Sequence, residues 1–324
     1  MAVSRQIGAE GYRLPCVTVQ VDPEMPALLR GSSGSVAAAL IDARLRRLVA
    51  LQNEVLADRD PEPLHQMRVS FRRLRSTLEQ FAPALCLPDA ADPRRVARIA
   101  RRLGLARDLD VLRRRLDVDL VPLLPERELE PLKPLFKQLR RERRLAFEEL
   151  RDCLQGRRYL KLLAKLQGWL KQPVFTPLGE EPLLAWRSEW LQACLAGLTT
   201  LPGWWASNPY DPTAIAELHG LRRRIKRARY GLSNLRAVDP DRIGPWLARL
   251  RQLQGLLGDL NDLQLIDAAL HRQLDGSPDQ LLPALCSLMA EQRVQAWQQW
   301  QAQAEPLRSV EGRAEFHSLA LIQA

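Results

Sequence analysis

The sequence predicts an all-α protein, and three observations support this fold class. From Ser33 onward, apolar residues recur at the three- and four-residue spacing of amphipathic helices. Proline and glycine interrupt this pattern at intervals, and the β-branched alternation expected of a sheet is missing. A segment that begins at Leu64 also recurs 154 residues later, at Leu218. A duplication of this length predicts two similar helical bundles packed about a pseudo-twofold axis.

Nine helical segments are predicted in order along the chain, each bounded by proline, glycine or both. Residues 1–27 are interrupted by Pro15, Pro23 and Pro26, and we interpret them as a tail of unknown role. Residues 311–324 are interpreted as a C-terminal tail. The predicted helical segments are 34–58, 64–82, 93–116, 127–154, 158–171, 182–200, 213–236, 242–274 and 279–304.

The internal repeat consists of two separate motifs that share one offset. The segment LHQMRVSFRRLRSTLEQF (Leu64–Phe81) aligns with LHGLRRRIKRARYGLSNL (Leu218–Leu235). The same offset places the dipeptide Leu-Gly at 103–104 on that at 257–258, and Asp-Leu at 108–109 on that at 262–263. Two motifs at one offset are hard to obtain by chance. The first repeat is therefore expected over about 33–156 and the second over about 182–304.

The basic charge is dominated by arginine and concentrated in one part of the chain. The formal net charge is +10, and 42 of the 48 basic residues are arginine. The segment from Pro63 to Arg158 contains 23 basic and 14 acidic residues, and this surplus accounts for nearly the whole net charge. Guanidinium groups bind phosphate oxygens through paired hydrogen bonds. A GC-rich genome, which favours arginine codons, is the other explanation of the arginine content. A concentrated positive field points to an anionic partner.

The repeated helix has a core face and an opposite basic face. At about 100° per residue, His65, Arg68, Arg72 and Arg75 share one side, and the apolar residues share the other. In the second copy the same positions are filled by His219, Arg222, Lys226 and Arg229. An ordinary solvated face mixes charges of both signs to gain ion pairs, but neither of these stripes contains an acid. We therefore expect both stripes to face a ligand.

Two further segments of the first repeat each carry a basic stripe. In the third segment the stripe comprises Arg94, Arg95, Arg98, Arg101 and Arg102, and in the fourth it includes Lys133, Lys137, Arg140, Arg144 and Arg151. In the second repeat Gln252 and Gly255 stand where the first has Arg98 and Arg101. The first repeat should therefore dominate ligand affinity. Asp108 either fixes an arginine in its working rotamer or makes a routine surface ion pair, and Gly104 is expected to permit close approach of two helices.

Several classes of protein are disfavoured by the sequence. Five widely spaced cysteines without a Cys-x-x-Cys motif argue against a disulfide framework or a zinc site and suit a reducing cytosol. No apolar run approaches the roughly 20 residues of a membrane span, and no signal pattern opens the chain. We expect a cytoplasmic protein without a metal or another cofactor.

The repeated segments and their Leu-Gly-x-x-x-Asp elements, seen here as LGLARD and LGDLND, resemble the conserved histidine α-helical domain (CHAD) family. The resemblance covers about residues 28–310. It implies two four-helix bundles around a basic groove or pore that binds inorganic polyphosphate without catalysis, and it implies association of some members with polyphosphate granules. Carried over by position, it implies that the ligand-facing residues are His65, Arg68, Arg72, Arg73, Arg75, His219, Arg222, Lys226, Arg227 and Arg229.

The full predicted site joins these residues to the neighbouring basic stripes. The added residues are Arg95, Arg98, Arg101, Arg102, Lys133, Lys137, Arg140, Arg144 and Arg223. Two other functions stay open. A nucleic-acid-binding protein would interleave exposed aromatics with its basic residues for base stacking. A metal-dependent phosphohydrolase or a phosphohistidine enzyme would use His65 and His219, but arginines flank both histidines and repel cations. Each histidine is either a buried hydrogen-bond donor or a phosphate contact.

Overall fold

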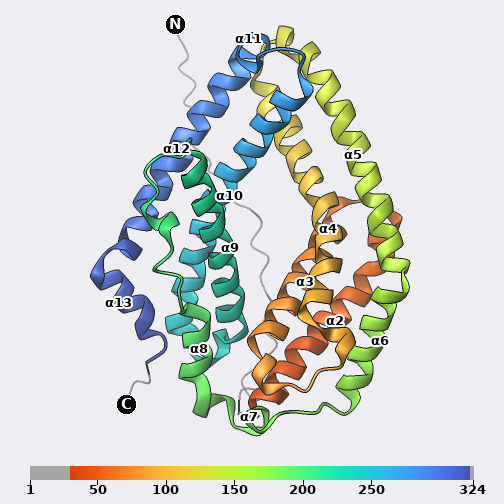
Figure 1. Ribbon diagram of the computed structural model, residues 1–324, viewed down its shortest axis with the longest axis vertical. Coiled ribbons are helices and arrows are strands. Elements are labelled where there is room, and N and C mark those ends of the chain that lie inside the picture. The colour runs from red at the N-terminus through yellow and green to blue at the C-terminus, as the bar shows by residue number, and fades with distance from the viewer. Residues whose placement is uncertain (1–29, 322–324) are drawn as a thin grey trace, which may run out of the picture.

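The computed structural model describes residues 30–321, which form an α-helical molecule without β-strands (Figure 1). The prediction of an all-α fold is confirmed. The predicted N-terminal tail, residues 1–27, lies outside the described residues. The long helices run roughly along the long axis of the molecule, in two groups that lie side by side (Figure 1).

The first group of helices is formed by residues 33–171, the first half. Its helices are α2 (Ser33–Ala57), α3 (Pro61–Gln80), α4 (Pro93–Arg114), α5 (Leu129–Gln155) and α6 (Arg157–Lys171). Helices α2 to α5 pack mainly against their neighbours in the chain, α2 on α3, α3 on α4 and α4 on α5, whereas α6 contacts both α5 and α2. A π-helical turn, Arg115–Leu120, continues α4.

The second group is formed by residues 177–318, the second half. Its helices are α7 (Pro177–Glu180), α8 (Arg187–Leu195), α9 (Pro212–Asn234), α10 (Pro240–Gln273), α11 (Pro278–Leu281), α12 (Pro283–Arg308) and α13 (Val310–Ser318). Helix α9 packs on α10, and α10 packs on α12. The two halves meet along α3 and α9, which also pack together.

The principal helices begin where the sequence supplies both a cap and a proline. The carboxylates of Asp60, Asp92 and Asp211 accept backbone hydrogen bonds of 2.7–2.8 Å in the first turns of α3, α4 and α9. In each case a proline follows directly, because its fixed φ suits the first helical position and it has no N–H to leave unpaired. These Asp-Pro pairs are the physical reason that the predicted helix starts fall within a few residues of the observed ones.

Two predicted elements differ from the structure. The segment predicted at 182–200 is a short 3₁₀ turn followed by α8, which ends at Leu195, two residues before Gly197 at φ +67°. The predicted C-terminal tail contains helix α13. Its Phe316 is fully buried, with its ring centroid 4.8 Å from that of Trp246. The packed part of the molecule therefore continues beyond residue 310.

The repeat offset is visible in the helices, but the buried side chains do not separate into two bundles. Helix α5 begins at residue 129 and α12 at 283, which again differ by 154. Gln80 and Asn234, also 154 residues apart, meet through a 2.9 Å hydrogen bond. The main hydrophobic core draws on both halves, and a smaller core joins the π-helical turn, α5, α10 and α12 at one end. The predicted arrangement of two bundles thus stays a prediction.

Candidate polyanion-binding groove

Basic side chains line a cavity of about 1150 Å³ between α3, α4 and α6, here called the first cavity. Helix α3 contributes Arg68, Arg72 and Arg75, because its basic face lies opposite its buried apolar face. Helix α4 contributes four of the five residues of its predicted stripe, Arg95, Arg98, Arg101 and Arg102, whereas Arg94 does not line the cavity. The structure therefore brings seven of the predicted residues to one cavity.

The third wall of the first cavity was not predicted as part of the site. Arg157, Arg158 and Lys161 line it from the first turns of α6. Cations in the first turn are opposed by the helix dipole, and no side chain caps this helix at Gly156. Three cations at such a helix start are a sequence signal that could have indicated a role outside helix stability.

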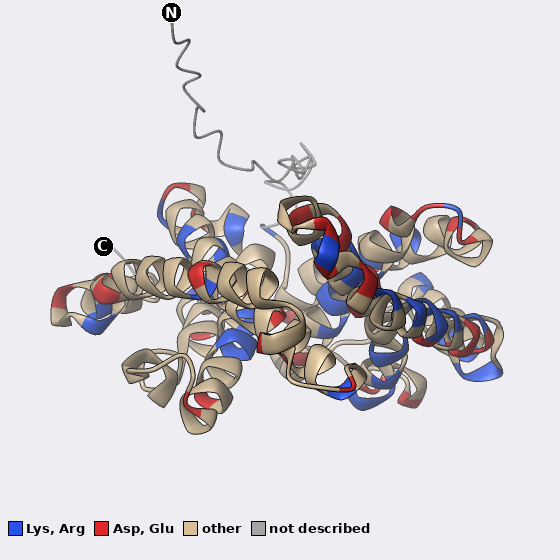
Figure 2. Ribbon diagram, turned by 90° about the horizontal axis from the view of Figure 1, so that it is seen from above, with Lys and Arg blue, Asp and Glu red and all other residues tan. Residues whose placement is uncertain are grey.

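A second cavity of about 560 Å³ lies between α3 and α9. Helix α9 contributes the predicted residues Arg223, Lys226 and Arg227, together with Arg224. The first and second cavities share Arg72 and Arg75, so α3 borders both. Figure 2 shows Lys and Arg on the helices of both halves, with dense runs at the side of the first half. We use "the groove" for the two cavities together.

Asp108 holds an arginine of the neighbouring helix. The Nη1 atom of Arg68 donates to the Asp108 carboxylate at 2.5 Å and to the carbonyl of Gly104 at 3.3 Å. The guanidinium thus lies across Gly104, where a β-carbon would be 3.9 Å from its Cζ. Gly104 was expected to permit close approach of a helix, but the group beside it is this side chain. Asp108 fixes Arg68 at the edge of the first cavity.

The second half lacks the same clamp. Arg222 lies against Gly258 as Arg68 lies against Gly104, because a β-carbon there would be 3.5 Å from its Nη2. However, Arg115 of the π-helical turn lies 3.3 Å from Asp259 and 3.9 Å from Asp262, the counterpart of Asp108. The carboxylates next to Gly258 therefore join the two halves and do not fix Arg222, whose Nε has no hydrogen-bond partner in the described residues.

The cations around the junction of α3 and α9 repel one another in the ligand-free protein. Burial, together with the charges of Arg222, Arg72 and Arg68, lowers the pKa of Lys226 to about 7. Burial also lowers the pKa of Arg72. The ring of Tyr230 lies beneath Arg72, with 5.7 Å between its centroid and Cζ, and offsets some of this repulsion. A multivalent anion would offset far more of it.

The two histidines line neither the first nor the second cavity. His65 is half-buried, and its pKa is lowered by burial and by the charge of Arg107, both of which disfavour the protonated ring. His219 is exposed, and its Nδ1 lies 3.2 Å from the side-chain oxygen of Asn261 on α10. It borders a third cavity of only about 30 Å³. These positions favour the interpretation of His219 as a link between α9 and α10.

The remaining predicted residues lie outside the two cavities. Arg73, Arg222 and Arg229 are half-buried beside them, and the Nε of Arg229 donates to Gln254 at 3.1 Å. The stripe on α5 is exposed and borders neither cavity; its members are Lys133, Lys137, Arg140 and Arg144. Lys133 pairs with Glu130 of its own helix at 2.5 Å. The fourth stripe is thus a solvated face in this structure.

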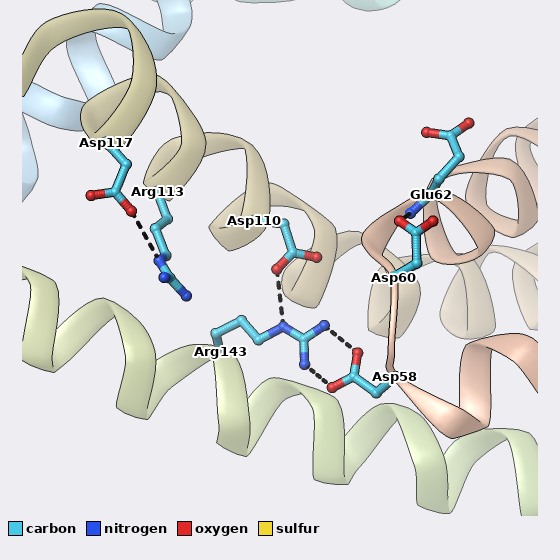
Figure 3. A network of polar contacts seen from close by, with 7 residues as sticks. All are labelled: Asp58, Asp60, Glu62, Asp110, Arg113, Asp117 and Arg143. Atoms are coloured by element: carbon cyan, nitrogen blue, oxygen red, sulfur yellow. Dashed lines mark hydrogen bonds and ion pairs between the residues drawn. The ribbon is translucent and has the colours of Figure 1, made fainter. Parts of the chain in front are cut away.

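Arg143, which the sequence did not single out, organises a polar network between α5, α4 and the loop before α3 (Figure 3). Its guanidinium pairs with both carboxylate oxygens of Asp58, in the loop between α2 and α3, and its Nε donates to Asp110 of α4 at 3.0 Å. These bonds raise the pKa of Arg143. The network joins α5, α4 and the start of α3, and so fixes two walls of the first cavity relative to each other.

Two features of residues 30–321 bear on the alternatives. No group of three His, Cys, Asp or Glu side chains in this part of the chain is placed to hold a metal ion. None of the helices described here is long and apolar enough to cross a membrane.

The chain is similar to several known proteins. A curated relative, Uncharacterized protein MT2285 of Mycobacterium tuberculosis (strain CDC 1551 / Oshkosh), is 29% identical over 231 residues, which are 68% of this chain and 42% of the relative. This chain therefore spans less than half the length of that relative. The crystal structure of the CHAD domain from the plant Ricinus communis superimposes with a TM-score of 0.61 at 25% identity, over 90% of this chain and 93% of that one.

PptA from Streptomyces chartreusis has the same fold, with a TM-score of 0.63 at 19% identity, over 85% of this chain and all of that one. The family model of the CHAD domain matches residues 39–271, well over half of the sequence. The repeated motifs, the helical fold and this match agree, and the chain belongs to the CHAD domain family.

Proposed function

We propose that this chain binds inorganic polyphosphate, or a closely similar polyanion, in the groove, and that it does so without catalysing a reaction. One observation carries the proposal. The first cavity is lined by ten cationic side chains and one carboxylate, Asp108, which is already paired with Arg68. A ligand with many closely spaced negative charges would relieve the repulsion among these cations and accept their paired N–H donors.

Family membership supports the same ligand. The motifs around His65 and His219 resemble those of CHAD domains, a resemblance that implies polyphosphate binding, and the chain belongs to this family. We extend the proposal to association with polyphosphate granules in the cytoplasm, or with enzymes that act on polyphosphate.

The lining of the groove favours polyphosphate over nucleic acid. Single-stranded nucleic acids are bound by aromatic side chains that stack on their bases. No aromatic side chain lines the first cavity. In the second cavity, Tyr230 already lies beneath the guanidinium groups of Arg72 and Arg229. The exposed Trp205 borders neither cavity. A ligand that has charges but no bases matches this lining.

Charge reversal in the first cavity tests the proposal. Arg98 and Arg101 are exposed and line it, so the double variant Arg98→Glu/Arg101→Glu should keep its helical content. Each well-formed charge-assisted hydrogen bond contributes roughly 1.5–3 kcal/mol, so polyphosphate affinity should fall at least about tenfold. Affinity is measured by titration calorimetry, and helical content by far-UV circular dichroism.

The control is Arg127→Glu/Arg272→Glu, which makes the same change of charge on two exposed arginines outside both cavities. It should bind nearly like the wild type. If the Arg98/Arg101 variant also binds like the wild type, the first cavity is not the site. If single-stranded DNA displaces polyphosphate at equal phosphate concentration, the ligand is nucleic acid.

A further inference from the structure

The two cavities of the groove differ in what a short and a long anion can reach. They lie on either side of α3 and share only Arg72 and Arg75. A ligand that occupies both must therefore pass over one helix, whose diameter with side chains is about 10–12 Å. A chain of three phosphates is too short to do this, whereas a long polyphosphate is not.

Each cavity has cations of its own on the far side of this crossing. The first has eight that the second lacks, on α3, α4 and α6: Arg68, Arg95, Arg98, Arg101, Arg102, Arg157, Arg158 and Lys161. The second has four, all on α9: Arg223, Arg224, Lys226 and Arg227. A short anion thus has a complete set of partners in the first cavity and does not need α9.

The crossing point itself is partly neutralised. Arg75 pairs with Glu79 through a 2.7 Å contact between its Nε and the carboxylate. Glu79 is the one acid that lines the second cavity, and it stands beside the shared arginines. Arg72 is half-buried, and its Nε has no partner in the described residues. Of the two shared arginines, Arg75 is thus neutralised within its own helix, and most of the cations that only one cavity has lie beyond these two residues.

We propose that the second cavity selects ligands by length: it binds only phosphate chains long enough to cross α3 from the first cavity. This inference rests on the proposed function and assigns α9 a part in it. Once the first cavity holds a chain, binding of its remainder to α9 is intramolecular, so affinity gains from a high local concentration. Affinity should rise steeply when the chain becomes long enough to reach Arg223 and Arg227.

The experiment compares two ligands, tripolyphosphate and long-chain polyphosphate, near 0.15 M ionic strength, where charges beyond about 8 Å are screened. The variant is Arg223→Glu/Arg227→Glu, in which both side chains are exposed and lie one turn apart on α9. It should lose roughly tenfold or more in affinity for the long chain and less than about twofold for tripolyphosphate. Arg127→Glu/Arg272→Glu is the control for net charge, and circular dichroism checks folding.

The Arg98→Glu/Arg101→Glu variant completes the comparison, because it should weaken both ligands. Equal loss for both ligands in the α9 variant, or no loss for either, overturns the inference, as does a wild type that binds both ligands equally well per molecule. Wild-type protein that binds neither ligand refutes the proposed function instead, so the two failures are distinguishable.

Discussion

At the scale of single residues, the groove contains one position where a permanent charge has been replaced by a titratable one. Arg72 on α3 and Lys226 on α9 occupy equivalent places in the repeat, and both are half-buried beside the second cavity. Arginine stays protonated at all ordinary pH values. The pKa of Lys226 is lowered to about 7 by burial, by Arg222 on its own helix and by Arg72 and Arg68 on α3, with Asp108 of α4 opposing them.

Polyphosphate affinity should therefore depend on pH through Lys226. A bound anion favours the ammonium form, so binding raises the pKa of Lys226 and takes up a proton. Affinity is then highest below pH 7 and falls as the pH rises from about 7 towards the pKa of the complex. A single linked proton gives a decrease on the order of tenfold between about pH 6 and pH 8.5. Calorimetry in buffers of different ionisation enthalpy measures the proton uptake directly.

The conservative variant Lys226→Arg isolates this effect. It keeps the charge, so its affinity at pH 6 should match that of the wild type, while the dependence above pH 7 should largely disappear. Long chains are used for both proteins, because the terminal phosphates, which also titrate near neutrality, are then few. An unchanged pH profile in Lys226→Arg would show that another group carries the linkage. Without ligand, the lowered pKa of Lys226 acts in the opposite direction on stability. Between about pH 7 and 10.5 the unfolded chain holds more protons at this lysine than the folded protein, so the free energy of unfolding rises with pH.

At the scale of helices, the start of α12 depends on a residue from the other half of the molecule. Glu128, only 1% exposed, precedes α5, and its two carboxylate oxygens accept hydrogen bonds from the backbone N–H groups of Ala284 and Leu285 at 2.8 and 3.0 Å. It therefore serves as a helix cap supplied from 156 residues away. A negative charge at this end of α12 is also favoured by the helix dipole.

Removing this cap should destabilise the whole protein. The variant Glu128→Ala leaves one buried and one partly buried N–H group without this partner, so the free energy of unfolding should fall by about 2 kcal/mol, at the upper end of the range for lost caps. Denaturant unfolding of the wild type and of Glu126→Ala, a neighbouring exposed glutamate, provides the comparison. If both variants unfold at the same denaturant concentration, the contact contributes nothing measurable.

The helices were largely predictable from the sequence because their determinants are local. Asp-Pro pairs at 60–61, 92–93 and 211–212 mark the starts of α3, α4 and α9, and apolar spacing gives their buried faces. The basic stripes of α3 and α4 were predicted for the same reason. The wall formed by Arg157 and Lys161 was not, because its role depends on where α6 packs. The stripe on α5 is exposed and borders neither cavity, so its role in binding stays a prediction: a periodic basic face alone does not reveal what lies opposite it.

Partners distant in sequence were the least predictable part of the site. Asp108 was recognised as a residue that could position an arginine, but its partner is Arg68, 40 residues earlier, and not an arginine of its own helix. The pairing of Arg143 with Asp58 and Asp110 could not be predicted from the residues that surround each of them in the sequence. Helical periodicity assigns a side chain to a face, whereas the identity of its partner depends on the packing of whole helices.

At the scale of the whole molecule, the two halves share one main hydrophobic core. Phe81 of the first half packs on Trp190 of the second, with 4.9 Å between ring centroids. Arg115 and Glu128 add polar links between the halves. Because buried side chains of both halves are in contact, we expect the protein to unfold in a single thermal transition, with the walls of the groove intact until that point.

Polyphosphate should raise the temperature of that transition. A ligand that binds only the native state at a hundredfold excess over Kd adds about 2.7 kcal/mol to the free energy of unfolding. This increase in the free energy of unfolding should shrink when the ionic strength is raised from about 0.05 M to about 0.2 M, because release of condensed cations from the polyanion is less favourable at higher salt. Scanning calorimetry at both salt concentrations tests this. If long-chain polyphosphate does not change the melting temperature, binding in the groove is contradicted.

The hydrogen bond between Asn234 and Gln80 has a consequence for how such a site can diversify. In a symmetric pair of separate, identical chains, the residue at a given position on the axis always meets a copy of itself, and any substitution changes both sides at once. A single chain that contains both halves is free of this constraint. It can place an amide opposite a shorter amide, Tyr230 at the position that corresponds to Ser76, and a titratable Lys226 at the position that corresponds to Arg72. The covalent connection thus allows one surface to combine a constant charge with a variable one.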